Sequence, residues 1–493
     1  MSRRRFIAGA AGALAVGAVG PGVLGALDTG ADARSGQASA TATAESRAAA
    51  LRVLGRTGLR VPGSRAYPNL AAGIDTLPGI DHVVVLMMEN HSYDDMFGML
   101  RRGDGYTLDA KGRPTASNPY PDGSIQHAFH MPTTCQLPGT PSQEWLASHN
   151  AYNNGANDGF VSTPISSGTS EIVGGVAMGY WTGDDLPFTY SLASKFPIGD
   201  RFFCSLLGQT DPNRRYLIAG TSAGMTDDIG EGLGNALPDA SLPLPANGTI
   251  FNQLDLHGIT WTNYVTSYPL GATPNLFPTT DAVTEILHYK PFSQFFDDAA
   301  AGALPAFTLL DEDYSAQSQE NPQNIVVGEA MMAQVVEALG ASPLWGQTLL
   351  IINWDEHGGY YDHVPPPPAL VPDLIPPIVQ LGESWYDGFA RYGFRVPSVV
   401  VSPYAKRDHV SHVVYDHTSI LALIERKWNL PALTYRDANA NDLTDFLDLK
   451  ALARQDPTFP KLPRLAAPGN TAAALACSVN GPGTVPPPDS ISD

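Results

Sequence analysis

Two unbroken apolar runs, His82–Met88 and Thr348–Trp354, constrain the fold of this chain more than any other sequence feature. Each run has the length of a strand but lacks the apolar/polar alternation of a strand with one face in water. Strands that are apolar on both faces belong to parallel sheets covered by helices. Residues 306–310 and 396–401 are further candidate strands.

The segment before the second run has helical periodicity. Met332, Val335, Val336 and Leu339 fall at i, i+3, i+4 and i+7, which predicts an amphipathic helix that leads into the strand. Short apolar runs alternate with helical patterns of this kind along the chain. We therefore predict an α/β fold with a mostly parallel central sheet flanked by helices.

Residues 1–33 have the order of a twin-arginine export signal. Arg3, Arg4 and Arg5 precede an apolar, Gly/Ala-rich run and small-residue cleavage options that end near Ala33. The alternative is a transmembrane anchor, but glycines and Pro21 interrupt the run. We predict that the twin-arginine export machinery recognises this segment. The mature chain is then secreted or associated with the cell envelope, without a stable membrane span.

The rest of the chain divides by composition. Residues 34–75 are rich in Ala, Gly, Ser and Thr, which predicts a linker or N-terminal extension. Residues 76–466 hold the strand and helix patterns and form the predicted catalytic domain. Residues 467–493 are rich in Pro and Gly, which is typical of a flexible tail.

Charge and cysteine usage limit the function. The net charge of −20, from 29 basic and 49 acidic residues, disfavours a nucleic-acid binder or an anionic-membrane binder. A local positive centre such as a metal ion still captures phosphate. The cysteines Cys135, Cys204 and Cys477 show no CxxC spacing, and Cys135 with Cys204 is a candidate disulfide.

Acidic residues follow both apolar runs directly. Glu89 and Asn90 follow the first run, and Asp355 and Glu356 follow the second. The carboxyl ends of parallel strands meet at one edge, so these side chains would converge and the carboxylates would repel one another. Mg²⁺, Ca²⁺ or Mn²⁺ suits such oxygen ligands, whereas Zn²⁺ or iron would need histidine as well. The alternative is that these residues cap the helices that follow.

A hydroxyl lies at a predicted helix start. Thr210 and Asp211 precede Pro212, which suits a first helical turn, and an apparent strand ends near Leu206. The unpaired amides of a helix N-terminus favour phosphate, and a metal that contacts the Thr210 oxygen would make it a nucleophile. The alternative is an ordinary threonine at a helix cap.

Six separated motifs, in this order, resemble those of the bacterial phosphoesterase family, which contains phospholipases C and certain acid phosphatases and is similar to plant non-specific phospholipases C. They are ENHSYDDMFG (residues 89–98), MGY (178–180), DLPF (185–188), TDPNR (210–214), DEHGGYYDHVP (355–365) and YDHTSI (415–420). The resemblance covers about residues 80–446 and implies an alkaline-phosphatase-like fold with a metal at the strand ends.

The resemblance also implies roles for single residues. It makes Glu89, Asn90, Asp355 and Glu356 metal ligands, and Thr210 the nucleophile that forms a phosphothreonine intermediate. The family histidines that orient phosphate or protonate the leaving alcohol correspond to His417 and His149, with His363 as a weaker third candidate. The implied function is a secreted, metal-dependent hydrolase of phosphate esters, with phospholipase C or acid phosphatase activity.

Some positions depart from the family pattern. Asp95, Gln143 and Asn321 stand where the family has histidine. The alternative function is therefore a catalytically impaired protein that binds phosphate or lipid at the cell surface. Aromatic residues at the mouth of a site would indicate a phospholipid substrate, and the candidates, which pack the core in the alternative interpretation, are Trp181, Phe188 and Trp385.

Overall fold

The computed structural model describes residues 44–135, 141–162, 174–228, 243–266, 273–277, 286–312, 317–320, 323–379 and 383–469. The predicted export signal, most of the predicted tail and Asn321 lie outside the described residues. Residues of the predicted linker contact the domain: Gly63 donates its backbone N–H to Ala432 and Gly73 donates to Trp428. The boundary at residue 75 stays a prediction.

A central sheet of eight strands organises the described part of the chain. Its order is β12 (Val410–Ser411), β6 (Ile198–Gly199), β11 (Ser398–Val401), β10 (Thr348–Trp354), β1 (His82–Met88), β9 (Phe307–Asp311), β7 (Trp261–Val265) and β8 (Tyr289–Pro291). β1 is parallel to both β10 and β9, and β7 is parallel to β9 and β8. β11 runs antiparallel to β10 and β6. The predicted α/β class with a mostly parallel sheet is confirmed, with β11 as the reversed strand.

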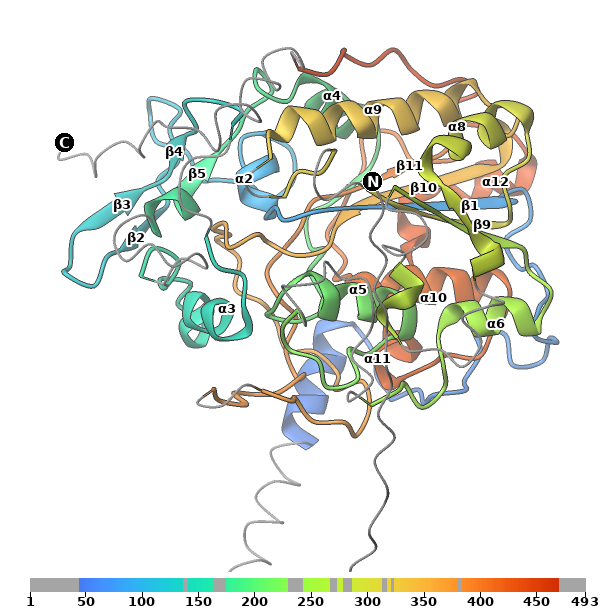
Figure 1. Cartoon of the computed structure of the whole chain (residues 1–493), viewed down its shortest axis with the longest axis horizontal. Helices are drawn as coiled ribbons and strands as arrows, with labels where there is room; N and C mark the ends of the chain where they lie inside the picture. The colour runs from blue at the N-terminus through green and yellow to red at the C-terminus, as the bar shows by residue number, and fades with distance from the viewer. Residues whose placement is uncertain are drawn as a thin grey trace, which may run out of the picture. The chain divides into compact units, whose positions relative to one another are not determined.

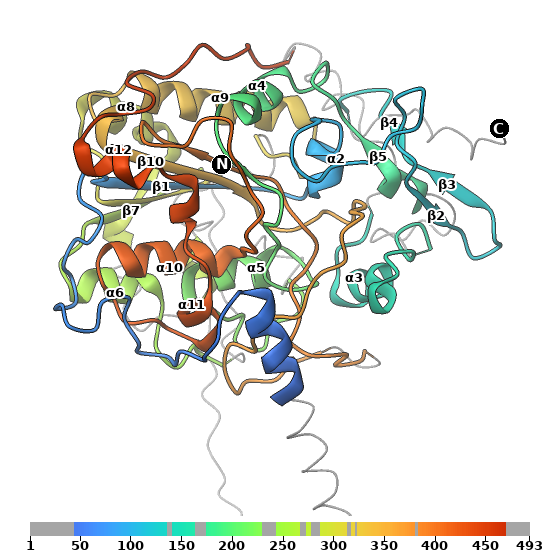
Figure 2. The same cartoon turned by 180° about the vertical axis from the view of Figure 1, so that it is seen from behind.

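Helices cover the two faces of this sheet (Figures 1 and 2). One face carries α4 (Pro187–Lys195), α8 (Phe292–Ala301) and α9 (Ile325–Ala341). The other carries α5 (Thr210–Ala219), α6 (Ile250–Leu256), α10 (His417–Lys427) and α11 (Tyr435–Asn439). The helix predicted around Met332 is α9, and the predicted periodic residues are all buried.

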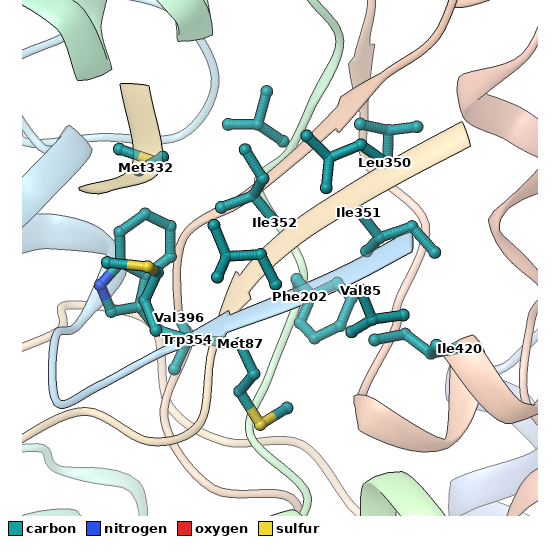
Figure 3. Close-up of a cluster of buried hydrophobic side chains, with 14 of the residues drawn as sticks. Val85, Met87, Phe202, Met332, Leu350, Ile351, Ile352, Trp354, Val396 and Ile420 are labelled. Atoms are coloured by element: carbon teal, nitrogen blue, oxygen red, sulfur yellow. The ribbon is translucent and has the colours of Figure 1, made fainter. Parts of the chain in front are cut away.

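The core lies between the sheet and these helices. β1 and β10 are buried along almost their whole length, and Figure 3 shows Val85 and Ile351 in one cluster with Met332 of α9 and Ile420 of α10. Burying each such aliphatic side chain contributes about 1.5–3 kcal/mol. The central strands are therefore held in place by packing on both faces.

Three further α-helices and two small sheets complete the elements that matter for the site. They are α2 (Tyr93–Phe97), α3 (Trp145–Tyr152), α12 (Leu449–Arg454), the pair β2 (Ser117–Pro119) and β3 (Ile125–His127), and the pair β4 (Phe129–His130) and β5 (Gly179–Tyr180). Among the described residues, no helix has both the length and the apolarity to cross a membrane.

Several local expectations differ from the structure. Cys204 is a free, buried thiol, so the prediction of a Cys135–Cys204 disulfide is wrong. No strand ends near Leu206, because Phe202 and Phe203 form only isolated bridges after β6. Trp181 and Phe188 are fully buried in the core, whereas Trp385 is 56% exposed.

Candidate active site

The acidic residues predicted to converge do lie at one edge of the sheet. In the register of β1, Met88 pairs with Trp354 of β10 and Met87 pairs with Asp311 of β9. Glu89 and Asp355 therefore follow paired residues on neighbouring strands, and Asp311 ends the third strand beside them. Asp311 is not among the predicted ligands, although it too is a carboxylate at the end of a buried strand.

The turns after β1 and β10 are built on each other. The backbone N–H of Asn90 donates to Asp355 Oδ1 at 3.0 Å, and the backbone N–H of Glu356 donates to the same oxygen at 2.7 Å. Asn90 has a φ of 60°, a left-handed conformation that asparagine tolerates better than most residues. Gly358 donates its backbone N–H to Glu356 Oε2 at 2.7 Å. The four predicted ligands thus form one interlocked pair of turns.

Thr210 joins this edge from a distant part of the chain. It is the first residue of α5, after Gln209 as the N-cap, so the predicted helix start is confirmed. Its Oγ1 donates to Glu89 Oε2 at 3.0 Å, and its side chain is buried. The structure therefore places the hydroxyl, the helix N-terminus and the strand-end carboxylates together.

Arg214 lies one helical turn after Thr210 and contacts three of the carboxylates. Its Nη2 is 2.6 Å from Glu89 Oε1, its Nε is 3.4 Å from Asp355 Oδ2, and its Nη1 is 3.6 Å from Asp311 Oδ1. All of these side chains are almost fully buried. Sequence reasoning missed Arg214, although its i+4 spacing from Thr210 puts the two side chains on one helix face.

The surroundings of Arg214 hold more negative than positive charge. Burial and repulsion by Asp355 raise the pKa of both Glu89 and Glu356 well above its usual range. Burial also raises the pKa of Asp211 to about 6 and that of Glu320 to about 7. Carboxylates crowded in this way need either protons or a further cation to be stable.

The oxygen atoms of this edge fit a hard divalent cation. Asn90 Oδ1 and Glu356 Oε1 are buried and make no hydrogen bond within the described residues, whereas Asp355 Oδ2 has the 3.4 Å ion pair with Arg214. Buried polar atoms of this kind call for a partner, and carboxylate and amide oxygens are the ligands of Mg²⁺, Ca²⁺ and Mn²⁺.

A second group of possible metal ligands consists of Asp94, Asp362 and His363. Their ligand atoms lie within 4.8 Å of one another.

His417 lies behind the site and makes two protein contacts. Its Nε2 donates to the backbone oxygen of Asp355 at 2.6 Å, and its Nδ1 accepts from Asn353 Nδ2 at 3.1 Å. The ring is fully buried, His417 is the first residue of α10, and burial lowers the pKa of His417. Both ring nitrogens are engaged, so His417 holds the turn that carries Asp355.

His149 lies on α3 and has other partners. Its Nδ1 is 2.7 Å from the backbone oxygen of Trp145, its Nε2 is 4.0 Å from Asp387 Oδ1, and its ring stacks on Tyr386 at 4.0 Å. None of these contacts involves Thr210, and burial lowers the pKa of His149 to about 4. His357, which was not among the predicted site residues, follows Glu356 in the chain. Its Nδ1 lies 3.1 Å from Glu356 Oε2, and burial lowers its pKa to about 3.

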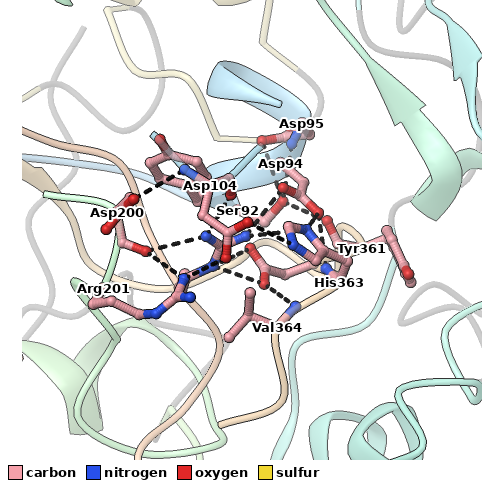
Figure 4. Close-up of polar contacts among 12 residues, drawn as sticks. Ser92, Asp94, Asp95, Asp104, Asp200, Arg201, Tyr361, His363 and Val364 are labelled. Carbon is pink, nitrogen blue, oxygen red and sulfur yellow. Dashed lines mark hydrogen bonds and ion pairs between the residues drawn. The ribbon is translucent and has the colours of Figure 1, made fainter. Parts of the chain in front are cut away.

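His363 and Asp95 belong to a polar network around α2 (Figure 4). His363 Nδ1 is 2.7 Å from Asp94 Oδ2, and Arg395 forms ion pairs with Asp94 and Asp362. Asp95, at a position where the resemblance implies histidine, has its Oδ2 2.6 Å from His91 Nδ1. Burial raises the pKa of Asp95 to about 6, although His91 opposes the shift. The departure at position 95 is thus accommodated by a buried His–Asp pair.

Residues 80–431 match the model of the Phosphoesterase family. The chain belongs to the phosphoesterase family. As the motifs implied, this makes it a hydrolase of phosphoric ester bonds. Phospholipase C B of Mycobacterium tuberculosis is 30% identical over 455 residues, which cover 80% of this chain and 83% of that protein. Non-specific phospholipase C6 of Arabidopsis thaliana is 28% identical, with 76% and 74% covered.

Solved structures similar to this phosphoesterase are more distant. A protein in the alkaline phosphatase superfamily from Vibrio parahaemolyticus has a TM-score of 0.30 and 11% identity, and covers 70% of this chain and 76% of its own. Murine ectonucleotide pyrophosphatase/phosphodiesterase 5 has a TM-score of 0.32 and 10% identity, with 53% and 94% covered.

Proposed function

We propose that this phosphoesterase is an exported phospholipase C that uses Thr210 as its nucleophile. The alternative activity is that of an acid phosphatase, whose substrates are soluble phosphate monoesters. The observation that carries the proposal is the 3.0 Å hydrogen bond from Thr210 Oγ1 to the buried carboxylate of Glu89. A carboxylate in this position accepts the hydroxyl proton as the oxygen attacks. The N-terminus of α5 favours the phosphate that is attacked.

The proposed reaction has two steps. Thr210 Oγ1 gives its proton to Glu89 and bonds to phosphorus while the ester P–O bond breaks, and the phosphoryl group, with any head group it carries, stays on Thr210. The alcohol leaves with a proton from a water molecule. The hydroxide that remains attacks the same phosphorus, the bond from phosphorus to Thr210 Oγ1 breaks, Thr210 takes its proton back from Glu89, and the phosphate product is released. Arg214, which lies between Glu89 and Asp355, offsets the negative charge that gathers at this edge during both steps.

We propose Glu89, Asn90, Asp355 and Glu356 as the residues that hold a divalent ion, with Mg²⁺, Ca²⁺ or Mn²⁺ favoured over Zn²⁺ or iron. The unpartnered Asn90 and Glu356 oxygens support this assignment. When bound, the ion supplies positive charge for the phosphoryl oxygens and lowers the pKa of the Thr210 hydroxyl. His417 positions Asp355 through the 2.6 Å bond to its backbone oxygen. Proton transfer by His149 or His363 stays a prediction.

The phospholipid substrate and the export route are parts of the same proposal. The relatives in bacteria and plants that match most of this chain are phospholipases C by name. The exposed Trp385 offers an aromatic side chain of the kind that enters a lipid interface. The arginine-rich first residues support export through the twin-arginine machinery.

The deciding experiment compares hydrolysis of p-nitrophenyl phosphate and of phosphatidylcholine vesicles by the purified mature chain, with and without a chelator. We expect release of diacylglycerol, loss of turnover with chelator and recovery with one divalent ion. Thr210→Ala should reduce turnover by about 1000-fold or more, because the nucleophile is removed. Diacylglycerol release that Thr210→Ala leaves unchanged would refute the proposed nucleophile.

Thr189→Ala is the matched control. Thr189 also lies in the first turn of a helix, α4, and its Oγ1 donates to the buried carboxylate of Glu329 at 2.9 Å. This variant should keep its turnover. The alternative function, a surface protein that binds phosphate or lipid without turnover, is supported if the metal-loaded wild type binds phosphate but hydrolyses neither substrate.

A further inference from the structure

A cavity of about 530 Å³ lies beside α3, and neither Thr210 nor Glu89 is among the residues that line it. Its wall is formed by α3 and the turn after it on one side and by the segment before β11 on the other. The lining residues are His149, Asn150, Tyr152, Asn153, Asn154, Tyr386, Asp387 and Arg391. This volume lies within the range of about 300–1,000 Å³ of small-molecule sites, and such sites combine aromatic walls with a few placed polar groups.

The hydrogen bond between His149 and the backbone oxygen of Trp145 determines which ring nitrogen of His149 carries the proton. A backbone carbonyl only accepts, so the proton is on Nδ1, which lies 2.7 Å from Trp145 O. Nε2 then carries a lone pair and accepts. Burial lowers the pKa of His149 to about 4, so the ring is neutral at neutral pH. The buried side chain of His149, 4% exposed, therefore presents an acceptor to the cavity wall.

A second acceptor faces this lone pair. Asp387 Oδ1 lies 4.0 Å from His149 Nε2, too far for a direct bond. Asp387 Oδ2 accepts from Arg391 Nε at 2.6 Å, which neutralises the carboxylate and fixes its orientation. Each of these two acceptors needs a hydrogen from a donor group. The cavity therefore selects a ligand with an O–H or N–H group.

The other walls narrow the ligand class further. The Arg391 guanidinium lies over the Tyr152 ring at 4.5 Å, so that aromatic face already carries a cation. A quaternary ammonium group has no N–H to donate to His149 and would meet Arg391. An anion would meet the two acceptors, His149 Nε2 and Asp387 Oδ1. A hydroxyl group donates its one proton to His149 Nε2 or to Asp387 Oδ1 and accepts from Arg391 or from the amide of Asn150 or Asn154, and a neighbouring hydroxyl donates to the other acceptor.

We propose that this cavity is a binding site for a neutral polyhydroxylated ligand: a sugar, inositol or glycerol unit, either free or as the head group of a lipid. Vicinal hydroxyls match the alternating acceptors and donors of the wall. The carbon face of such a ring packs on Tyr386, whose own ring stacks on His149 at 4.0 Å. In this site His149 binds the ligand, a role different from the proton transfer that the family resemblance implies for it. The proposal goes beyond the proposed hydrolysis, since occupancy does not depend on turnover.

Hydrogen bonds connect the cavity with the helix that carries Thr210. The backbone N–H of Trp145, at the start of α3, donates to Asp227 Oδ1 at 2.7 Å. The next residue, Asp228, accepts from the backbone N–H of Asp211 at 2.8 Å and donates its own N–H to Gln209 Oε1 at 2.8 Å. Asp227 and Asp228 thus link the start of α3, which lines the cavity, to the N-terminus of α5, which carries Thr210.

The test is calorimetric titration of the full mature chain with myo-inositol, glucose and glycerol, with choline chloride and inorganic phosphate as counter-probes. We expect at least one polyol to bind, and binding to weaken about tenfold or more in Asp387→Asn and in Tyr386→Ala. The amide group introduced by Asp387→Asn would place a donor against His149 Nε2 and remove the ion pair with Arg391. Tyr386 is 42% exposed, so its truncation leaves the core intact.

The matched control is Asp109→Asn. Asp109 and Arg113 form the same i,i+4 Asp–Arg pair, with 2.9 Å between Arg113 Nε and Asp109 Oδ2, on the surface away from the cavity. This variant should bind the polyol as wild type does. A shift of the His149 Nε2 ¹⁵N resonance on titration with polyol, but not with choline or phosphate, places the ligand at the cavity.

Vesicles distinguish the two sources of the hydroxyl-rich unit. Binding to phosphatidylinositol or phosphatidylglycerol vesicles that is stronger than binding to phosphatidylcholine vesicles and is lost in Asp387→Asn indicates a lipid head group. Binding of free polyols alone indicates a soluble sugar or polyol. The proposal is overturned if no polyol binds at millimolar concentration, if choline or phosphate binds in a manner sensitive to Asp387→Asn, or if both variants bind polyols as wild type does.

Discussion

Gly358 lies against the backbone carbonyl of Asn90, so closely that a Cβ at position 358 would be 2.2 Å from that oxygen. Gly358 also has a φ of +63°, which side chains rarely adopt. The turn that follows β10 can therefore approach the turn that follows β1 only because residue 358 is glycine. This contact holds Asp355 and Glu356 beside Glu89 and Asn90.

Gly358→Ala should accordingly destabilise the fold and separate the two turns. A left-handed conformation costs an alanine about 1–2 kcal/mol. We expect the free energy of unfolding to fall by more than this, because the clash with the backbone adds to the cost. Urea denaturation measures the change. Gly123→Ala is the control, since Gly123 has a φ of +86° but nothing within 4 Å of its added Cβ. Equal losses in the two variants would contradict the clash.

Arg214→Met should leave Glu89 and Asp355 buried without their cation. We expect a loss of about 3–5 kcal/mol in the free energy of unfolding, measured in urea with a chelator present. Adding Glu89→Gln should restore part of the loss, because the neutral amide no longer needs Arg214. A double-mutant cycle with no coupling between the two substitutions would mean that the 2.6 Å contact carries no net interaction.

Arg395→Met tests the network of Figure 4. Arg395 is fully buried and lies 3.1 Å from Asp94 Oδ1 and 3.0 Å from Asp362 Oδ1. Its loss should cost about 3–5 kcal/mol by thermal or urea unfolding. Arg113→Met, which breaks the exposed pair with Asp109, should cost less than about 1 kcal/mol. A similar small cost for Arg395→Met would show that water replaces the guanidinium.

Acid should destabilise the chain partly through His149. The pKa of His149 is lowered by burial from 6.5 to about 4, so between these values the unfolded chain binds a proton that the folded chain does not. Stability therefore falls as pH falls through this window, by about 3 kcal/mol in total from this residue. The His149→Gln variant should show a flatter dependence of unfolding free energy on pH from about 6.5 to 4. An unchanged slope would contradict the buried neutral ring.

Trp385→Ala should separate lipid from soluble substrates. Because Trp385 is exposed, its removal should weaken vesicle hydrolysis about threefold to tenfold and leave p-nitrophenyl phosphate hydrolysis unchanged. Leu256→Ala, which removes a 73% exposed apolar side chain from α6, is the control and should change neither rate. Equal losses on both substrates would argue against a lipid-facing Trp385.

Much of the fold could be predicted because its signals are local. The bounds of β1 and β10 were predicted to the residue, since a strand buried on both faces is an unbroken apolar run. The start of α5 at Thr210 followed from Pro212 in the first turn. The antiparallel direction of β11 could not be predicted, because an apolar run has the same composition in either direction.

The candidate site was predictable only in part. The rule that acids follow buried strands found Glu89 and Asp355 but gave no sign that Arg214 lies between them. The free thiol of Cys204 was likewise not predictable, because disulfide pairing depends on the distance between Cβ atoms rather than on spacing in sequence. The roles of His417 and His149 depend on which atom each ring nitrogen faces, and only packing sets that.

The sequence by itself determined the α/β class, the central strands, the helix that begins at Thr210 and the family, since periodicity and ordered motifs are properties of short segments. Only the tertiary structure decided which charges meet. Arg214 and Glu89 are 125 residues apart and are joined by a 2.6 Å contact. Such a contact arises because the register of the sheet and the packing of α5 bring distant residues into the same buried space, where a charge without a partner is costly.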